Sequence, residues 1–279
     1  MQYMEKDTQR WGRVLWISDG KTEVAVALDF GIRVVHLSCC GCENLFYEQP
    51  VDGSDGFTTG EWKLYGGHRI WLAPESAGTY CPDNAPVRYT ITNDEILFEQ
   101  DLESMLKIYK RLRLRFMADG AISVEQEIQN GSDQVIDGAV WGVNTLDGGG
   151  EAEISFRCKQ RGGYNPQRVI SLWSDTNLAD PRLQFERDRL IARHMPVPDY
   201  LKLGLYSNPG KAVLRNKGQI FELTFNTDDL ELYPDNGCNF ELYMCMKFME
   251  LESLGQKTRI LPGQHATHTE VWRLEKCDC

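Results

Sequence analysis

The sequence predicts an all-β fold of antiparallel strands. Apolar and polar residues alternate with a period of two over many short runs, as in strands that bury one face. Gly, Asp and Asn residues separate these runs, and long stretches with the 3.6-residue period of a helix are nearly absent. The clearest runs cover residues 13–18, 22–30, 32–38, 87–93, 95–100, 108–117, 121–129, 219–225, 239–253 and 262–275.

Length and composition indicate one domain over residues 1–279. The chain has no evident linker, and all-β sandwiches of roughly 200 to 250 residues commonly form one domain. Hydrophobic residues make up 42% and charged residues 25%, close to the average of globular proteins. One large core is therefore expected.

The charge pattern disfavours two classes of partner. The formal net charge is −11, and no stripe of Lys and Arg is interleaved with aromatic residues, so neither nucleic acid nor an anionic membrane is an expected partner. No apolar run reaches the length of a membrane span, and the first residues lack the apolar core of a signal peptide. The sequence therefore predicts a cytoplasmic location.

The cysteines predict free thiols. Nine cysteines are an odd number, and without an export signal a disulfide framework is not expected. A zinc site assembled from both ends of the chain is the alternative, but the spacing CC-x-C lacks the paired C-x-x-C motifs of structural zinc sites. No metal or other cofactor is expected. The cysteines of this alternative site are Cys39, Cys40, Cys42, Cys277 and Cys279.

The runs at 108–117 and 121–129 predict a hairpin with a defined register. Pairing Arg115 with Glu125 places Arg113 opposite Glu127 and brings apolar residues together on the other face. This pairing needs a loop of odd length, which we expect to contain three residues with Gly120 at a positive φ. The alternating Arg and Glu side chains are expected to form a solvated face.

The run at 239–253 is the first candidate for a functional site. Its apolar face continues in the same parity into Glu250 and Glu252. An ionised carboxylate is costly to bury without a partner or a ligand, so the two glutamates indicate a binding site if that face stays buried. Spacing alone leaves an equal alternative, in which the strand leaves the core at Phe248 and both glutamates are solvated. The apolar residues of this face are Phe240, Leu242, Met244, Met246 and Phe248.

The segment 63–76 is the second candidate. Its glycine pair, Gly66 and Gly67, permits the close approach of another backbone or a ligand. A Trp ring can stack on the apolar face of a sugar, Arg can donate to hydroxyl groups, and His can act as an acid or a base. The alternative is a core Trp beside a surface Arg and a hydrogen-bonded His. The sugar-competent side chains after the glycine pair are His68, Arg69, Trp71 and Glu75.

Several segments together resemble a known family. The closing segment FMELES…RILPGQHATHTEVWRL is similar to the end of aldose 1-epimerases (galactose mutarotases), in which a strand with a leucine–glutamate pair precedes L-x-PG and a strand with H-T-x-x-W. The segments GGHRIWLAPES, YCPDNAPV, LWSDTNLADPR and YPDNGCNFELY resemble a bacterial branch of that superfamily. These matches span most of the chain, and the closing motif is the one specific to the wider superfamily.

The resemblance implies an antiparallel β-supersandwich of the galactose mutarotase-like type, with a sugar cleft on one sheet. It also implies that a glutamate of the late strand removes the anomeric hydroxyl proton, which places the base at Glu252 with Glu250 as its alternate. The epimerases carry a further catalytic His in a strand motif that begins N-H. The comparable stretch here, WGVNTLDGGG, has Asn144 and no His, so His68 is the candidate acid.

Two functional hypotheses follow for a small carbohydrate ligand. In the first, the protein is an enzyme in which Glu252 is the base, His68 is the acid, and Arg69 and Trp71 orient the sugar. In the second, the same groups only bind a carbohydrate. We predict that His68, Arg69, Trp71 and at least one of Glu250 and Glu252 line one cleft. The remaining candidate binding residues are Glu75 and Asn144.

Overall fold

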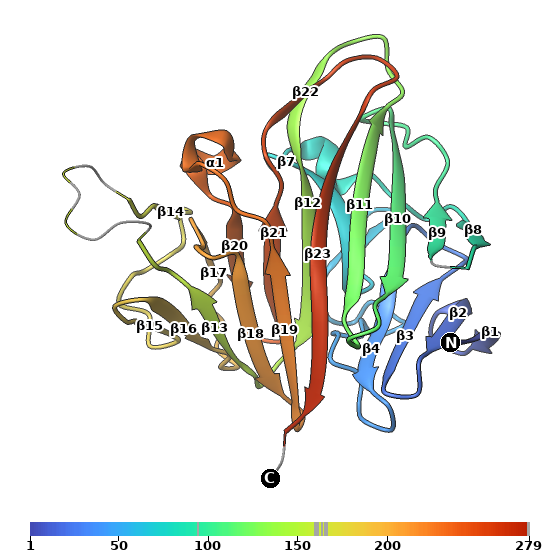
Figure 1. Cartoon of the computed structure of the whole chain (residues 1–279), viewed down its shortest axis with the longest axis horizontal. Helices are drawn as coiled ribbons and strands as arrows, with labels where there is room; N and C mark the ends of the chain where they lie inside the picture. The colour runs from blue at the N-terminus through green and yellow to red at the C-terminus, as the bar shows by residue number, and fades with distance from the viewer. Residues whose placement is uncertain (94, 159–161, 163, 165–166, 278–279) are drawn as a thin grey trace.

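The chain forms two large antiparallel β-sheets that face each other (Figure 1). The computed structural model describes residues 1–93, 95–158, 162, 164 and 167–277. The first sheet, called the β12 sheet below, has 11 strands among these residues. In sheet order they are β1 (Gln2–Thr8), β2 (Gly12–Ser18), β3 (Thr22–Ala27), β4 (Val34–Cys39), β7 (Gly67–Ala73), β12 (Ile136–Asp147), β21 (Phe248–Leu254), β20 (Phe240–Met244), β17 (Leu201–Leu205) and β14 (Ile170–Leu172), with β22 (Thr258–Ile260) paired to β12.

The second sheet, called the β23 sheet, has 10 strands in the described part of the chain. Every strand pairing found among the described residues is antiparallel, as the sequence predicts. In sheet order the strands are β15 (Leu183–Phe185), β16 (Arg189–Arg193), β13 (Glu151–Ser155), β18 (Lys211–Asn216), β19 (Gln219–Phe225), β23 (His265–Lys276), β11 (Ile122–Asn130), β10 (Ile108–Phe116), β9 (Ile96–Glu99) and β8 (Arg88–Ile91).

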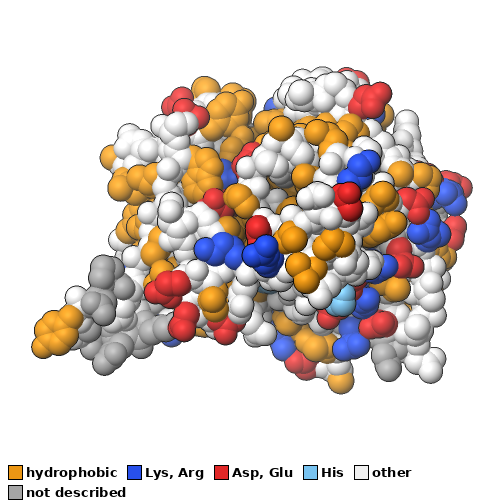
Figure 2. Space-filling model, turned by 90° about the horizontal axis from the view of Figure 1, so that it is seen from above, with side chains coloured by type: hydrophobic (Ala, Val, Ile, Leu, Met, Phe, Trp, Pro, Cys, Tyr) orange, Lys and Arg blue, Asp and Glu red, His pale blue; other side chains and the backbone are white. Residues whose placement is uncertain are grey.

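Little regular structure lies outside these sheets. A small hairpin joins β5 (Thr58–Thr59) to β6 (Trp62–Lys63), and the helical pieces are η1 (Ala77–Tyr80), η2 (Leu230–Leu232) and α1 (Pro234–Gly237). None of the helices in the described residues is long and apolar enough to cross a membrane. On the face drawn in Figure 2, basic and acidic side chains lie interspersed rather than in one patch of a single charge.

The main core fills the space between the two sheets. Alternation along each strand sends one set of side chains into this space and the other set outward. In β7, Ile70 and Leu72 point into the core, where the buried apolar residues of the other sheet include Val124 of β11 and Trp272 of β23. The outward-facing residues of β7 and of its neighbours therefore form a separate surface.

The hairpin of β10 and β11 forms as expected, but its register differs by two residues. Arg113, rather than Arg115, lies opposite Glu125, and Arg111 lies opposite Glu127. The loop does have three residues, 118–120, between the paired Met117 and Ala121, and Gly120 has a φ of 82°. The position of Gly120 explains the shift, because a three-residue hairpin loop has its left-handed residue at the last position. The charged face is only partly solvated, since Glu127 is 4% exposed.

The run at 239–253 is a hairpin of two strands, so the prediction of one continuous strand is wrong. The chain turns between Met244 and Met249, which lie opposite each other, and the Cys245 amide donates to the Phe248 carbonyl oxygen at 3.1 Å. The turn reverses the parity: Phe240 shares the core face with Leu251, whereas Glu250 and Glu252 point outward.

The cysteines in the described part of the chain are free thiols, and Cys279 lies outside it. No group of three or more His, Cys, Asp and Glu residues within that part is arranged to hold a metal ion. The zinc site considered above would also require Cys279, so it falls partly outside the described residues.

Candidate functional site

A cavity of about 260 Å³ opens on the face of the β12 sheet that points away from the core. Strands β7, β17, β20 and β21 form its floor, and the β5–β6 hairpin and η1 form its walls. Its lining residues include three acidic side chains, one basic side chain and several aromatic rings. They are Gly56, Phe57, Thr59, Trp62, Leu64, Trp71, Glu75, Tyr80, Lys202, Tyr243, Phe248, Glu250 and Glu252.

The glycine pair fixes how β7 joins the sheet. Gly66 and Gly67 have φ values of 83° and 75°, which residues other than glycine rarely adopt. A Cβ atom on Gly66 would lie 1.8 Å from the carbonyl oxygen of Tyr47, and one on Gly67 would lie 2.2 Å from that of Val34. The pair thus permits the close backbone approach predicted from the sequence.

Aromatic rings form a continuous wall of the cavity. The ring centroids of Trp62 and Trp71 are 6.4 Å apart, and Tyr80 lies edge-on to both at 5.2 and 5.6 Å. Across the cavity floor, Phe248 contacts Tyr243 at 5.8 Å. Such rings can stack on the apolar face of a ring-shaped polar ligand.

Strand pairing brings a cluster of carboxyl groups together around one lysine. Glu241 lies opposite Glu252 in the β20–β21 hairpin, and Lys202 of β17 lies on the other side of β20. The Nζ atom of Lys202 is 3.0 Å from Glu75, 3.0 Å from Glu241 and 4.0 Å from Glu252. Burial lowers the pKa of Lys202, but these carboxylates outweigh burial and raise it above its ordinary value. Lys202 is therefore a fixed cation.

Glu252 is the least compensated of these carboxyl groups. It is 1% exposed, and its Oε2 atom receives no hydrogen bond from the described residues. Burial raises its pKa well above the ordinary value, although the charge of Lys202 opposes this change. Burial likewise raises the pKa of Glu241 to about 7 against the same lysine. Near neutral pH this cluster therefore holds protons that it can give or take.

Glu250 has better support for its negative charge. The hydroxyl group of Thr145 donates to its Oε1 atom at 2.7 Å, and the positive charge of Arg69 acts on it as well. Burial still raises its pKa, but the hydrogen bond and the charge oppose the rise. In this pair Glu250 is the better site for the negative charge and Glu252 for the proton.

Arg69 lies beneath the aromatic wall rather than at the cavity surface. Its guanidinium group is 4.9 Å from the ring centroid of Trp71 and 5.3 Å from that of Trp62. It donates to the carbonyl oxygen of Leu64, while its Nε and Nη1 atoms have no partner among the described residues. Burial lowers its pKa to about 9, so it remains a cation at neutral pH.

His68 and Asn144 lie on the opposite face of the β12 sheet, so the prediction that His68 lines the cleft is not met. The Nδ1 atom of His68 is 3.0 Å from Oδ1 of Asn144, and its ring packs against Trp272 of the β23 sheet at 5.1 Å. The alternation of β7 is regular, which separates His68 from Arg69 and Trp71. Burial lowers the pKa of His68 to about 3, so its ring is neutral.

Trp71, Glu75, Glu250 and Glu252 line the cavity as a group, whereas sequence reasoning missed Lys202 of the lining and its ion-pair partner Glu241. Lys202 and Glu241 each stand between apolar residues of a strand, in YLKLGL and NFELY. A lone charge in such a position is a usable signal, because charged residues are seldom buried unless they are paired.

The fold defined by these two sheets is that of the galactose mutarotase-like proteins. A galactose mutarotase-like protein from Lactobacillus casei aligns over 94% of this chain and 100% of its own, with 11% identity and a TM-score of 0.59. One from Clostridium acetobutylicum aligns over 99% and 98%, with 11% identity and a TM-score of 0.56. A galactose mutarotase related enzyme from Lactobacillus acidophilus aligns over 95% and 98%, with 12% identity and a TM-score of 0.55.

Sequence comparison adds no closer relationship. No family model matches the chain, and no curated protein matches its sequence. The fold predicted from the sequence is thus confirmed by structural likeness alone, and the function has to be argued from the cavity.

Proposed function

We propose that the cavity binds a carbohydrate of monosaccharide size and exchanges protons with its anomeric centre, as an aldose 1-epimerase does. The observation that carries this proposal is Glu252, a residue of the aromatic cavity whose buried Oε2 atom has no hydrogen-bond donor among the described residues. A buried polar atom without a partner is costly, and a ligand hydroxyl group would supply the missing donor.

The size of the cavity supports a small ligand. Its volume of about 260 Å³ lies below the roughly 300–1,000 Å³ of pockets that hold drug-sized molecules. The rings of Trp62 and Trp71 offer apolar faces, and the carboxyl groups offer acceptors for hydroxyl groups. This combination of flat apolar surface and clustered acceptors suits one sugar ring.

The carboxyl pair can supply both proton transfers of ring opening. Ionised Glu250 takes the proton of the anomeric hydroxyl group, the bond between C1 and the ring oxygen breaks, and protonated Glu252 gives its proton to that oxygen. Rotation about the C1–C2 bond presents the other face of the aldehyde, and the reverse transfers close the ring as the other anomer. The resemblance assigns the base to Glu252. We assign it to Glu250, because Thr145 and Arg69 support its charge.

A kinetic experiment tests this assignment. We expect the protein to accelerate the change in optical rotation of freshly dissolved aldoses, and we expect Glu250→Gln and Glu252→Gln each to reduce that acceleration by about 10²- to 10⁴-fold. Each amide keeps the shape of the side chain, so sugar binding measured by calorimetry should change much less. Glu95→Gln, which alters a carboxylate outside the cavity, is the matched control.

One observation favours a purely binding role as the second candidate. No histidine belongs to the described lining of the cavity, so the acid would have to be a carboxyl group. Sugar binding without any acceleration of anomer exchange would support this second role. If no sugar of a broad aldose panel binds, both candidates are overturned.

A further inference from the structure

We infer that the carbohydrate bound in this cavity carries a protonated amino group, which places it among the amino sugars. This inference rests on the proposed function, and it follows from an imbalance of charge. Two basic side chains of the described residues, Lys202 and Arg69, act on the cluster of carboxyl groups at the cavity. The carboxyl groups number four and belong to Glu75, Glu241, Glu250 and Glu252.

Lys202 is engaged in ion pairs, whereas Arg69 forms none among the described residues and acts on the cluster through its charge. Lys202 forms its two short ion pairs, each at 3.0 Å, with Glu75 and Glu241. The charge of Arg69 supports Glu250 from beneath the aromatic wall. Asp83, the acidic group that also acts on Arg69, belongs to a separate buried ion pair with Arg33 at 2.9 Å. The cluster therefore holds two more carboxyl groups than cations, and Glu252 has the weakest support.

Aromatic rings of the wall and beside it already lie against cations. The Nζ atom of Lys202 lies 4.7 Å from the ring centroid of Trp141, and the guanidinium group of Arg69 lies 4.9 Å from that of Trp71. Aromatic faces attract cations, most strongly where water is excluded. An ammonium group in the cavity would meet both aromatic rings and carboxylates, whereas a neutral hydroxyl group would gain only a hydrogen bond.

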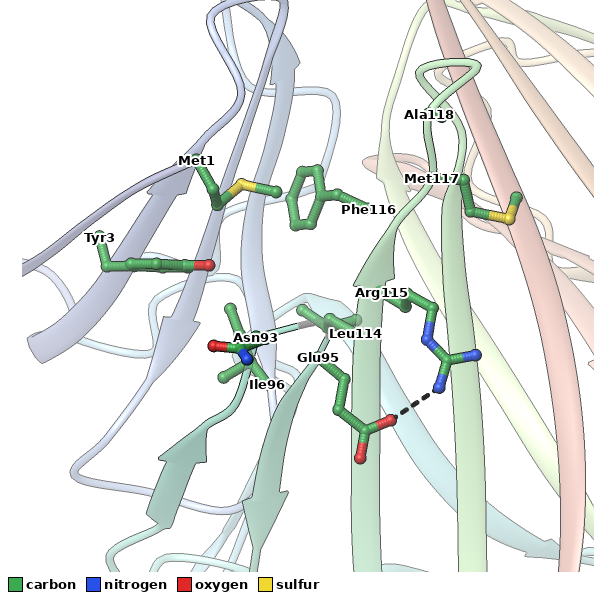
Figure 3. A pocket seen from close by; sticks show the side chains of 10 residues that line it. All are labelled: Met1, Tyr3, Asn93, Glu95, Ile96, Leu114, Arg115, Phe116, Met117 and Ala118. Carbon is green, nitrogen blue, oxygen red and sulfur yellow. Dashed lines mark hydrogen bonds and ion pairs between the residues drawn. The ribbon is translucent and has the colours of Figure 1, made fainter.

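A second hollow of the molecule contains a carboxylate whose charge is balanced by the protein itself. This hollow, of about 480 Å³, lies beside β1, β9 and β10. Its one acidic side chain among the described residues, Glu95, is joined to Arg115 at 3.0 Å (Figure 3). The protein supplies the balancing cation there. It supplies none for Glu252 within hydrogen-bonding distance in the described residues.

The inferred charge agrees with the proposed chemistry. Burial raises the pKa of Glu241 to about 7 and that of Glu252 well above its ordinary value, so these two groups can hold protons in the empty cavity. A bound ammonium group adds a cation and lowers the pKa of Glu241, which then loses its proton, while Glu252 can keep the proton needed for the acid step. Binding of the amino sugar should therefore release up to about one proton to the solvent.

Titration calorimetry at pH 7 tests the inference. Glucosamine and galactosamine should bind at least about tenfold more tightly than glucose, galactose and N-acetylglucosamine, because the neutral sugars gain no charge pairing. Repeating the titrations in two buffers of different ionisation enthalpy gives the number of protons released. Glu252→Gln should reduce the preference for the amine, and Glu95→Gln should leave it unchanged.

The outcomes separate the inference from the function on which it rests. Neutral sugars that bind as tightly as the amino sugars, without proton release, would overturn the inference and leave the proposed function standing. Binding of choline without binding of any sugar would overturn both, and so would the absence of binding by every compound. A preference that survives Glu252→Gln unchanged would also overturn the assignment of the charge to this cluster.

Discussion

Two buried glutamates, one from each sheet, differ in how their charge is supported. Glu270 of β23 points into the space between the sheets, where it accepts hydrogen bonds from Ser253, from the indole nitrogen of Trp272 at 2.7 Å and from Asn144 at 3.3 Å. Glu252 of β21 points the other way, into the cavity, and its Oε2 atom has no donor in the described part of the chain.

The difference shows that burial alone does not identify a functional carboxylate. Glu270 is 0% and Glu252 is 1% exposed, and burial raises the pKa of both. At Glu270 the donors oppose this rise, so the protein itself satisfies the group. At Glu252, a residue of the cavity lining, one oxygen has no hydrogen-bond donor among the residues that the structure describes. A buried carboxylate indicates a site when its own protein leaves it incomplete.

The same substitution at both glutamates tests this distinction most strongly. Glu270→Gln replaces one accepting carboxylate oxygen by an amide nitrogen, which cannot accept the hydrogen bonds donated there. We therefore expect the free energy of unfolding at pH 7 to fall by about 3 kcal/mol. Glu252→Gln removes a poorly supported carboxyl group, so we expect a change of less than about 1 kcal/mol, or an increase. Urea unfolding followed by circular dichroism measures both. Equal losses would contradict the distinction.

A pH series gives the next largest effect. The pKa of Glu241 is raised to about 7 in the folded protein, above its value in the unfolded chain. Its contribution to stability is therefore present at low pH and is lost as the pH rises through about 7. We expect the free energy of unfolding to fall between about pH 4.5 and 7, with a slope of up to about 1.4 kcal/mol per pH unit for each proton. Glu241→Gln should flatten this slope, and an unchanged slope would argue against the shifted pKa.

The smallest effect is expected at His68. Because its ring faces the interior beside Asn144, we expect His68→Gln to change the rate of anomer exchange by less than about threefold, far below the effect of losing a general acid. Rates measured per folded molecule separate this effect from any loss of stability. A loss of rate of about 100-fold or more, on the order expected for an acid–base group, would instead identify His68 as the general acid.

The strands were predictable because alternation is a local signal, whereas pairings between distant strands were not. The turn after Met244 was missed because Cys245, Met246 and Lys247 include none of the usual turn residues. The register of the β10–β11 hairpin was misjudged because a shift of two residues keeps every side chain on its face.

The site was likewise predictable only where the signal is local. Trp71, Glu250 and Glu252 follow from the alternation of their own strands. The same alternation separates His68 from Arg69, but the prediction that both line one cleft did not follow it. Lys202 and Glu241 join the site only through the order β21, β20 and β17, which no local pattern contains. Three neighbouring strands thus supply the charges that determine the chemistry of the cavity.

The tryptophans in and near the cavity should make the intrinsic fluorescence of the protein sensitive to ligand binding. Of the seven tryptophans, Trp62 and Trp71 line the cavity, and the Nζ atom of Lys202 lies 4.7 Å from the ring of Trp141 and 5.0 Å from that of Trp173. Indole emission responds to nearby charge and to water, both of which change when a ligand fills the cavity. Intrinsic fluorescence can therefore report occupancy without a label, and removing Trp62 and Trp71 one at a time would show which ring senses the ligand.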